Sequence, residues 1–320
     1  HCFTSFKLYY TINYSYTYSF HCCKHCIFLR FVNGVQGERI MLETLSNEIT
    51  CLRNSTRNPM DNVKMDFHLH DSYEIYLFLS GGVRYFIEKN SYDLVPGDIL
   101  LMRPDEIHKA TFTSNETYER IVVNFSENVL RTLSTEENEL DYCYSNRPHG
   151  EKNRLNSTDD EKNELLALFD KLIMFNTYEK KWNVQLKLSV FLELLVRINR
   201  IFSDDRHSSP THLNHQRLIP ILEYIDRNLH EDLSLKSLQD KFYISGSHLC
   251  QIFKQATGST LHEYIIYKRI SKAKRLLING ESAYGASLKC GFSDYSNFFR
   301  AFRKVTGYSP REYLKQITKQ

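Results

Sequence analysis

The sequence lacks the features that define membrane-spanning proteins and several common classes of enzyme. No apolar run approaches the ~18 residues needed to cross a bilayer, so we expect a soluble protein. No glycine-rich phosphate-binding loop is found, and no Ser/His/Asp or Cys/His arrangement typical of nucleophilic catalysis stands out. Catalysis therefore has little support. The 320 residues, of which 42% are hydrophobic, are enough to form the cores of two domains.

Acidic and basic residues are unevenly distributed along the chain. Residues 41–210 carry 20 Lys and Arg against 28 Asp and Glu, whereas residues 211–320 carry 17 against 9. The basic C-terminal third predicts contact with a polyanion, and nucleic acid is the leading candidate. A solvated basic surface is the alternative that charge alone leaves open.

The first forty residues do not resemble the rest of the sequence. They hold four of the eight cysteines, begin without Met, and show neither helical nor alternating periodicity. We interpret residues 1–40 as an upstream extension, disordered or non-native, with Met41 as the expected start. A zinc knuckle at HCCKHC (residues 21–26) is a weaker alternative, because structural zinc sites use a second pair of ligands some distance away. The other four cysteines are scattered, as in reduced cytoplasmic proteins.

Residues 65–112 predict short antiparallel strands. Apolar stretches are separated there by Gly-Gly, Lys-Asn-Ser and Pro-Gly, at the spacing of hairpins. We therefore expect a small all-β sandwich or barrel within residues 41–160. Its polar residues resemble the two motifs of the cupin barrel, in which three His and a Glu can converge on a metal. The first motif, formed by His68, His70 and Glu74, fits well. The second, which ends at His108, departs because it is one residue shorter and has Glu106 where Gly is common.

These histidines allow two interpretations. Neutral imidazoles and a carboxylate suit a divalent transition metal, which could support oxygenase or isomerase chemistry. The same groups can instead line a pocket for a small polar ligand, or form hydrogen bonds at the mouth of the barrel. We expect an effector pocket lined by His68, His70, Glu74 and His108, with no metal and no cofactor.

Residues 161–203 predict two amphipathic helices with a break near residues 176–182. Apolar side chains recur there at steps of three and four residues. The helices could cover the barrel or pair with a second chain in a homodimer. Residues 204–216 are polar and contain proline, which is typical of a linker.

The C-terminal third repeats one phrase at an offset of 49 residues. FKQATGSTLHEY (residues 253–264) returns as FRKVTGYSPREY (residues 302–313). If Ser245 caps a helix, Leu249, Ile252, Phe253 and Ala256 share a buried face, and Ser247, Cys250, Gln251 and Lys254 share the opposite, polar face. A short helix, a turn and a helix with a polar face are the helix-turn-helix arrangement, whose second helix enters the major groove. The second copy places Ser296, Phe299, Arg300 and Arg303 at the matching outward positions, with Ser293 or Asp294 as the cap.

The segment between the copies predicts a long helix. Thr260 and Glu263 have the spacing of a capping box, and about nineteen helical residues give a rod of ~28 Å. Successive major grooves on one face of DNA lie ~34 Å apart, so modest bending would let one chain read two consecutive turns.

Taken together, these motifs resemble the AraC/XylS family of bacterial transcription regulators. YISGSHLCQIFKQATG, EYIIYKRISKAKRLL and GFSDYSNFFRAFRKVTGYSPREYL follow the family's motifs in order, and the likeness covers most of residues 60–316. It implies a two-domain protein: a cupin-like effector domain followed by helices, and an all-α domain (217–320) with two helix-turn-helix units joined by a long helix. It also implies a sequence-specific regulator, often an activator, that commonly dimerises and senses a small molecule, often a sugar. Expected partners are promoter DNA in the nucleoid and, for an activator, RNA polymerase.

Base contacts and phosphate contacts are expected from different residues. We predict base contacts from Ser247, Cys250, Gln251, Tyr295, Ser296, Asn297 and Arg300, since Arg can pair with guanine, Gln with adenine, and Cys250 or Phe299 can touch a thymine methyl. We predict phosphate contacts from Lys254, Lys272, Arg275, Arg303 and Lys304.

The first helix of the second unit departs from the family pattern. Ala283, Gly285 and Ala286 stand where larger or charged residues are usual, and glycine costs about 1 kcal/mol in a helix relative to alanine. We therefore expect the first unit to dominate base reading. A metal-dependent cupin enzyme with a DNA-binding tail is the rival function, and a non-specific architectural DNA protein is a weaker one.

Overall fold

The computed structural model describes residues 41–63, 65–135, 139–177, 182–204 and 217–317. The predicted extension over residues 1–40 and all but the first residue of the predicted linker (204–216) lie outside this part of the chain. None of the described helices is both long and apolar enough to cross a bilayer.

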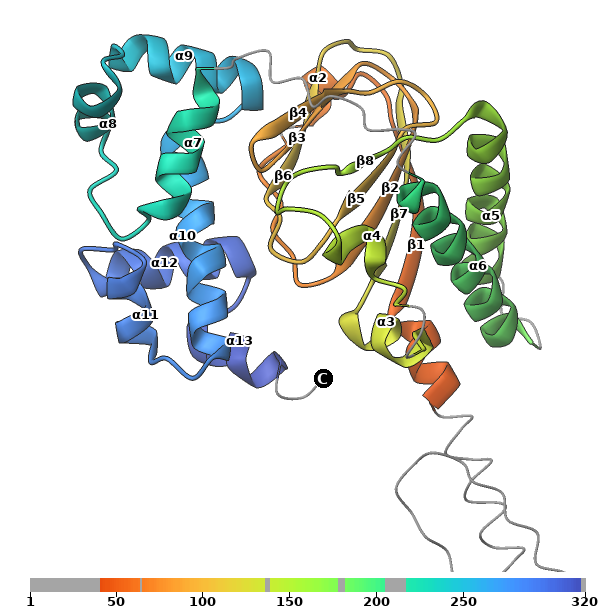
Figure 1. Ribbon diagram of the computed structural model, residues 1–320. Coiled ribbons are helices and arrows are strands. Elements are labelled where there is room, and N and C mark those ends of the chain that lie inside the picture. Colours follow the sequence, from red (N-terminus) through yellow and green to blue (C-terminus); the bar gives the residue numbers. More distant parts are fainter. Residues whose placement is uncertain (1–40, 64, 136–138, 178–181, 205–216, 318–320) are drawn as a thin grey trace, which may run out of the picture. The chain divides into compact units, whose positions relative to one another are not determined.

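The first half of the chain forms two antiparallel sheets (Figure 1). The five-stranded sheet has the order β1-β7-β2-β5-β8 and the three-stranded sheet the order β4-β3-β6. A cluster of buried aromatic and aliphatic side chains lies between them, and Tyr76, Phe78 and Tyr85 are among its members. The strands are β1 (Ile49–Thr56), β2 (Tyr73–Ser80), β3 (Val83–Ile87), β4 (Asn90–Asp93), β5 (Ile99–Met102), β6 (His108–Phe112), β7 (Tyr118–Phe125) and β8 (Arg154–Leu155). Short helices α2 (Pro59–Asn62), α3 (Glu127–Leu133) and α4 (Tyr142–Ser145) connect them.

Two long helices cover the five-stranded sheet, as Figure 1 shows beside β1. They are α5 (Asp159–Thr177) and α6 (Asn183–Ser203), so the predicted pair of helices is confirmed. The ring of Phe191 in α6 lies 5.0 Å, centroid to centroid, from that of Phe125 in β7. The buried apolar face of α6 therefore packs on its own sheet, and the alternative of a seam with a second chain is not needed to explain that face.

The second half of the chain is helical. Its elements are α7 (Leu218–Arg227), α8 (Leu235–Phe242), α9 (Gly246–Thr257), α10 (Leu261–Ile278), α11 (Ala283–Lys289), α12 (Tyr295–Thr306) and α13 (Pro310–Ile317). The predicted N-caps are found: the hydroxyl of Ser245 accepts from the His248 amide at 3.4 Å, and the Asp294 carboxylate accepts from the Asn297 amide at 3.0 Å. Of the two candidates for the second cap, Asp294 is therefore the residue used.

The 49-residue repeat corresponds to two similar units that share α10. Leu249 and Phe253 of α9 are fully buried in one core with α7, α8 and the first part of α10. Phe298 and Phe302 of α12 are fully buried in a second core with α11, α13 and the rest of α10. Both second helices end at a glycine with positive φ, Gly258 (67°) and Gly307 (80°), a C-cap conformation that other residues adopt only with strain.

The β-rich and helical parts belong to one compact unit, Thr44–Gln320, and they pack directly against each other. Phe67, Phe86 and Ile107 from the β-rich part join the first helical core. Two lysines of α10 reach carboxylates of the β-rich part: Lys268 lies 2.6 Å from Glu88, and Lys274 lies 2.6 Å from Asp71 and 2.8 Å from Asp105. The long helix therefore contacts both helix-turn-helix units and the β-rich part.

Candidate DNA-reading helices and effector site

Helix α9 presents the polar face that the sequence predicts. Its buried positions are Leu249, Ile252, Phe253 and Ala256, which fix the helix on the first core. Its exposed positions are Ser247, Cys250, Gln251 and Lys254. Because the two sets alternate at steps of three and four residues, burial of the first set directs the second set to solvent. Short polar side chains near the helix start, with a Lys one turn later, can reach base edges and phosphates.

Helix α12 presents the same face in the second unit. Ser296, Asn297, Arg300, Arg303 and Lys304 are exposed, and Tyr295 is 37% exposed. Arg300 donates from Nη2 to Oδ1 of Asn297 at 2.6 Å, which orients the guanidinium along the helix surface. Phe299 is half-buried, so it is a less accessible partner for a thymine methyl than the exposed Cys250.

The fold separates the basic residues of the helical part into two groups. Lys268 and Lys274 pair with carboxylates of the β-rich part, and Arg269 donates to the backbone carbonyls of Leu229 and Glu231. Within the described part of the chain, no salt bridge involves the predicted phosphate contacts, Lys254, Lys272, Arg275, Arg303 and Lys304. Those side chains can therefore contact an external anion. Sequence reasoning could not make this division, because each pairing involves a residue remote in the chain.

Helix α10 supplies the predicted spacer. It has 18 residues, which at ~1.5 Å per residue is a rod of ~27 Å. Its N-cap Thr260 accepts from the Glu263 amide at 3.2 Å, so the start of the predicted capping box is found.

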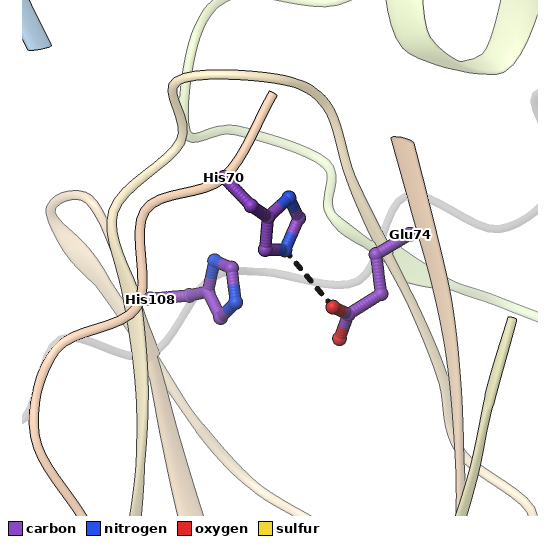
Figure 2. Close-up of side chains that lie close together, drawn as sticks. All are labelled: His70, Glu74 and His108. Carbon is purple, nitrogen blue, oxygen red and sulfur yellow. Dashed lines mark hydrogen bonds and ion pairs between the residues drawn. The ribbon is translucent and has the colours of Figure 1, made fainter. Parts of the chain in front are cut away.

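A second cluster of functional groups lies in the β-rich part. His70 precedes β2, Glu74 lies in β2, and His108 begins β6. Figure 2 shows the two imidazoles facing the Glu74 carboxylate. Their candidate ligand atoms all lie within 4.8 Å of one another, and His70 Nε2 is 3.0 Å from a carboxylate oxygen of Glu74. Glu74 and His108 are buried, and His70 is half-buried.

Burial and mutual charge shift the pKa of each group in this cluster. Burial lowers the pKa of His108 to about 4, against the opposing effect of Glu74, so this imidazole is neutral near pH 7. Burial acts to lower the pKa of His70 as well, but the hydrogen bond and charge of Glu74 outweigh it and raise that pKa. Burial acts to raise the pKa of Glu74, and its bond to His70 with the nearby imidazoles lowers it instead. Glu74 and His70 therefore stabilise each other's charged forms.

His68 is placed differently from the other predicted effector residues. Its backbone pairs with that of His108, and its ring centroid lies 5.8 Å from the ring of His108, but the side chain is exposed. It stays outside the group of converging ligand atoms. The structure thus brings three of the four predicted residues together and leaves His68 at the edge.

Sequence reasoning missed a set of polar aromatic residues next to the cluster. The ring of Tyr85 stacks on His108 at 6.1 Å, and it lies 4.8 Å from the ring of Tyr76. The Tyr76 hydroxyl is 2.8 Å from that of Tyr118, and the Arg120 guanidinium lies 4.8 Å from the Tyr118 ring centroid. Tyr76 follows Glu74 by two residues, so strand alternation placed both on one side. The two-residue spacing could therefore have predicted that Tyr76 lies on the same side of the sheet as Glu74.

Comparisons with known proteins match both parts of the chain. Residues 56–196 match a family described as the AraC-like ligand binding domain, and residues 238–316 match a family described as a helix-turn-helix domain. The HTH-type transcriptional activator RhaR of Mannheimia succiniciproducens is 23% identical over 255 residues, which cover 79% of this chain and 88% of that protein.

Two further likenesses extend over different shares of the chain. An uncharacterised HTH-type transcriptional regulator of Staphylococcus aureus is 29% identical over 153 residues, or 48% of this chain, and this chain spans only 20% of that protein's length. The structure of ToxT from Vibrio cholerae is 16% identical, with 83% of this chain and 98% of that chain covered at a TM-score of 0.36. The named relatives are regulators rather than enzymes, in agreement with the prediction that the chain is not an enzyme.

Proposed function

Because this chain belongs to the AraC/XylS family of bacterial transcriptional regulators, we propose that it binds specific promoter DNA through two reading helices, α9 and α12, under the control of a small-molecule effector. The observation that carries this proposal is the equivalence of the two helices. Each has a buried apolar stripe, an exposed polar stripe and a glycine C-cap, and the two helices share cores with successive parts of α10.

Base reading is assigned to the exposed residues near the start of each helix. These are Ser247, Cys250 and Gln251 in α9, and Tyr295, Ser296, Asn297 and Arg300 in α12. The cations without a salt bridge, Lys254, Lys272, Arg275, Arg303 and Lys304, position the protein on phosphates. The side chains support this division between base and phosphate contacts. A Lys can neutralise a phosphate in any DNA sequence, whereas the guanidinium of Arg300 is held in one orientation by Asn297 and can favour one base.

The effector is assigned to the β-rich domain, at the cluster of His70, Glu74 and His108 with His68 at its edge. The loops that carry this cluster also contact α10. The amide of Asp105 lies 3.3 Å from the carbonyl of His70, and Lys274 pairs with both Asp105 and Asp71. A ligand that moves these loops would act on the rod that joins the reading helices. A sugar is the first class to test, because carboxylate and imidazole groups hydrogen-bond to hydroxyls.

The remaining partners follow from this assignment. The relative from Mannheimia is named an activator, so we propose activation and contact with RNA polymerase. We also propose that the chain forms a homodimer through its first domain and acts at the nucleoid in the cytoplasm.

The test compares two substitutions on selected and on random DNA. A bound sequence is first selected from a random pool and located by footprinting. Arg300→Ala should relax preference at one base position and cost about 1–3 kcal/mol on the selected site only. Lys254→Ala should weaken binding to all sequences about equally and reduce the slope of log affinity against log salt by about one. Equal losses on both DNAs for both variants would contradict the division of roles, and absence of any protected site would contradict sequence-specific binding.

A further inference from the structure

Two backbone carbonyls fix the tautomers of the histidines in the β-rich domain. His70 Nδ1 lies 2.9 Å from the carbonyl oxygen of Ser72, and His108 Nδ1 lies 2.8 Å from the carbonyl oxygen of Glu106. A carbonyl oxygen can only accept a hydrogen bond, so each Nδ1 carries the proton. In the neutral imidazoles, Nε2 is then the unprotonated nitrogen of both rings.

This arrangement directs electron pairs toward the same point. The Nε2 of His70 faces a carboxylate oxygen of Glu74 at 3.0 Å, and the ring of His108 faces the same carboxylate (Figure 2). Two lone pairs and a carboxylate repel one another unless a cation lies between them. A proton on His70 satisfies only the contact between His70 and Glu74. A metal ion satisfies all three.

We propose that His70, Glu74 and His108 form a binding site for a divalent transition-metal ion. Imidazole nitrogen and carboxylate oxygen are ligands suited to Zn²⁺, Fe²⁺ or Co²⁺. Donor atoms that each lie ~2.1 Å from one ion are separated by roughly 3–4 Å. The observed separations are 3.0 Å for His70 and Glu74 and at most 4.8 Å for the other pairs, which is close to that range.

The carbonyls of Ser72 and Glu106 act as the outer partners of the two histidines. Metal-binding histidines donate their second ring N–H to a carbonyl or carboxylate, which sets ring orientation. The carbonyls of Ser72 and Glu106 hold the two rings in such an orientation. Three protein ligands leave coordination positions open, and these can take water or an oxygen atom of the effector. The regulatory consequence rests on the proposed function, whereas binding of the ion does not.

Cobalt binding by the full chain tests the site. The background protein carries Cys22→Ser, Cys23→Ser and Cys26→Ser, because these thiols could bind the ion themselves. Co²⁺ is titrated at pH 7.5 and followed by its visible absorption and by calorimetry. We expect one Co²⁺ per chain. Glu74→Gln and His108→Ala should each lower the affinity ~100-fold or more, while the control His68→Ala, outside the cluster, should change it by less than ~3-fold.

X-ray absorption of the Co²⁺ complex of the background protein gives a result that does not depend on whether the variants fold. Scattering from two imidazoles supports the site, and scattering from none or one overturns it. No binding at micromolar Co²⁺, or equal binding by Glu74→Gln, His108→Ala and the background protein, also overturns it. Footprinting of the same metal-free preparations separates the two proposals: a protected DNA site without metal binding rejects the metal site alone, and metal binding without a protected site rejects the proposed DNA function alone.

Discussion

The ammonium of Lys268 in α10 lies 2.6 Å from the carboxylate of Glu88 in the β-rich domain, and both side chains are buried. Glu88 also accepts from the amide of Ile107 at 2.8 Å, and Lys268 lies 3.0 Å from Asp226 of α7. The pair therefore ties the domain that carries the candidate effector site to the helix that joins the two reading helices. A buried charge left without its partner is strongly unfavourable.

We expect Glu88→Gln to lower the free energy of unfolding by about 1–3 kcal/mol, because it removes one of the two carboxylates that pair with the Lys268 ammonium. The double variant Glu88→Gln/Lys268→Met should lose less than the sum of the two single variants. Urea unfolding of the four proteins measures the coupling. Strictly additive losses would show that the pair does not couple the two parts.

The repeated glycines offer a matched comparison. Gly258 and Gly307 have similar positive φ values, 67° and 80°, so an alanine at either is strained by about 1 kcal/mol. A Cβ at Gly307 meets nothing within 4 Å, whereas a Cβ at Gly258 would lie 2.6 Å from Oγ1 of Thr111 in β6. We therefore expect Gly258→Ala to destabilise the protein more than Gly307→Ala in urea unfolding. In the double variant Gly258→Ala/Thr111→Ala, the extra loss of stability relative to Gly307→Ala should disappear. An equal loss for the two single variants would mean that Thr111 of β6 does not restrict a side chain at position 258.

Thiol labelling tests which face of α9 meets DNA. Burial raises the pKa of Cys51 to about 12 and that of Cys290 to about 11, and it raises the pKa of Cys143 as well, so these thiols stay protonated and unreactive at pH 8. Cys250 is exposed on the polar face of α9. Among these four cysteines, iodoacetamide should modify Cys250 first, and the selected DNA should slow that reaction at least ~10-fold, as peptide mass spectrometry can measure. Random DNA at the same concentration is the control; unchanged labelling with the selected DNA would place α9 away from the groove.

Local chemistry explains which parts of the fold were predictable. Ser245, Thr260 and Asp294 cap helices because a short oxygen side chain followed by apolar periodicity defines a helix start within a few residues. The sequence pattern did not predict strand β1. Only Ile49 and Cys51, on one side of ITCLRNST, are buried, and the strand pairs with β7, which follows about seventy residues later in the chain. An edge strand with polar residues gives a weak periodic signal.

In the candidate sites, too, local features were predictable and contacts between distant segments were not. The outward faces of α9 and α12 were predicted from helical periodicity, since the residues of both faces of a helix lie in one short segment of the sequence. The separation of His68 from the cluster was not, because it depends on how the chain before β2 lies against β6. The pairing of Lys268 and Lys274 with the β-rich part could not be predicted either, since their partners there lie more than 160 residues away.

The spacing of the two contacted DNA segments tests the central claim most directly. A rod of fixed length with two equivalent reading helices requires two protected segments on one face of the duplex, about 10–10.5 base pairs apart. Affinity is measured for the selected site and for the same site with five base pairs inserted between the segments, which turns one of them to the opposite face. The account predicts a loss of roughly 100-fold, since the contacts of one helix are forfeited. Unchanged affinity for the lengthened site would contradict it.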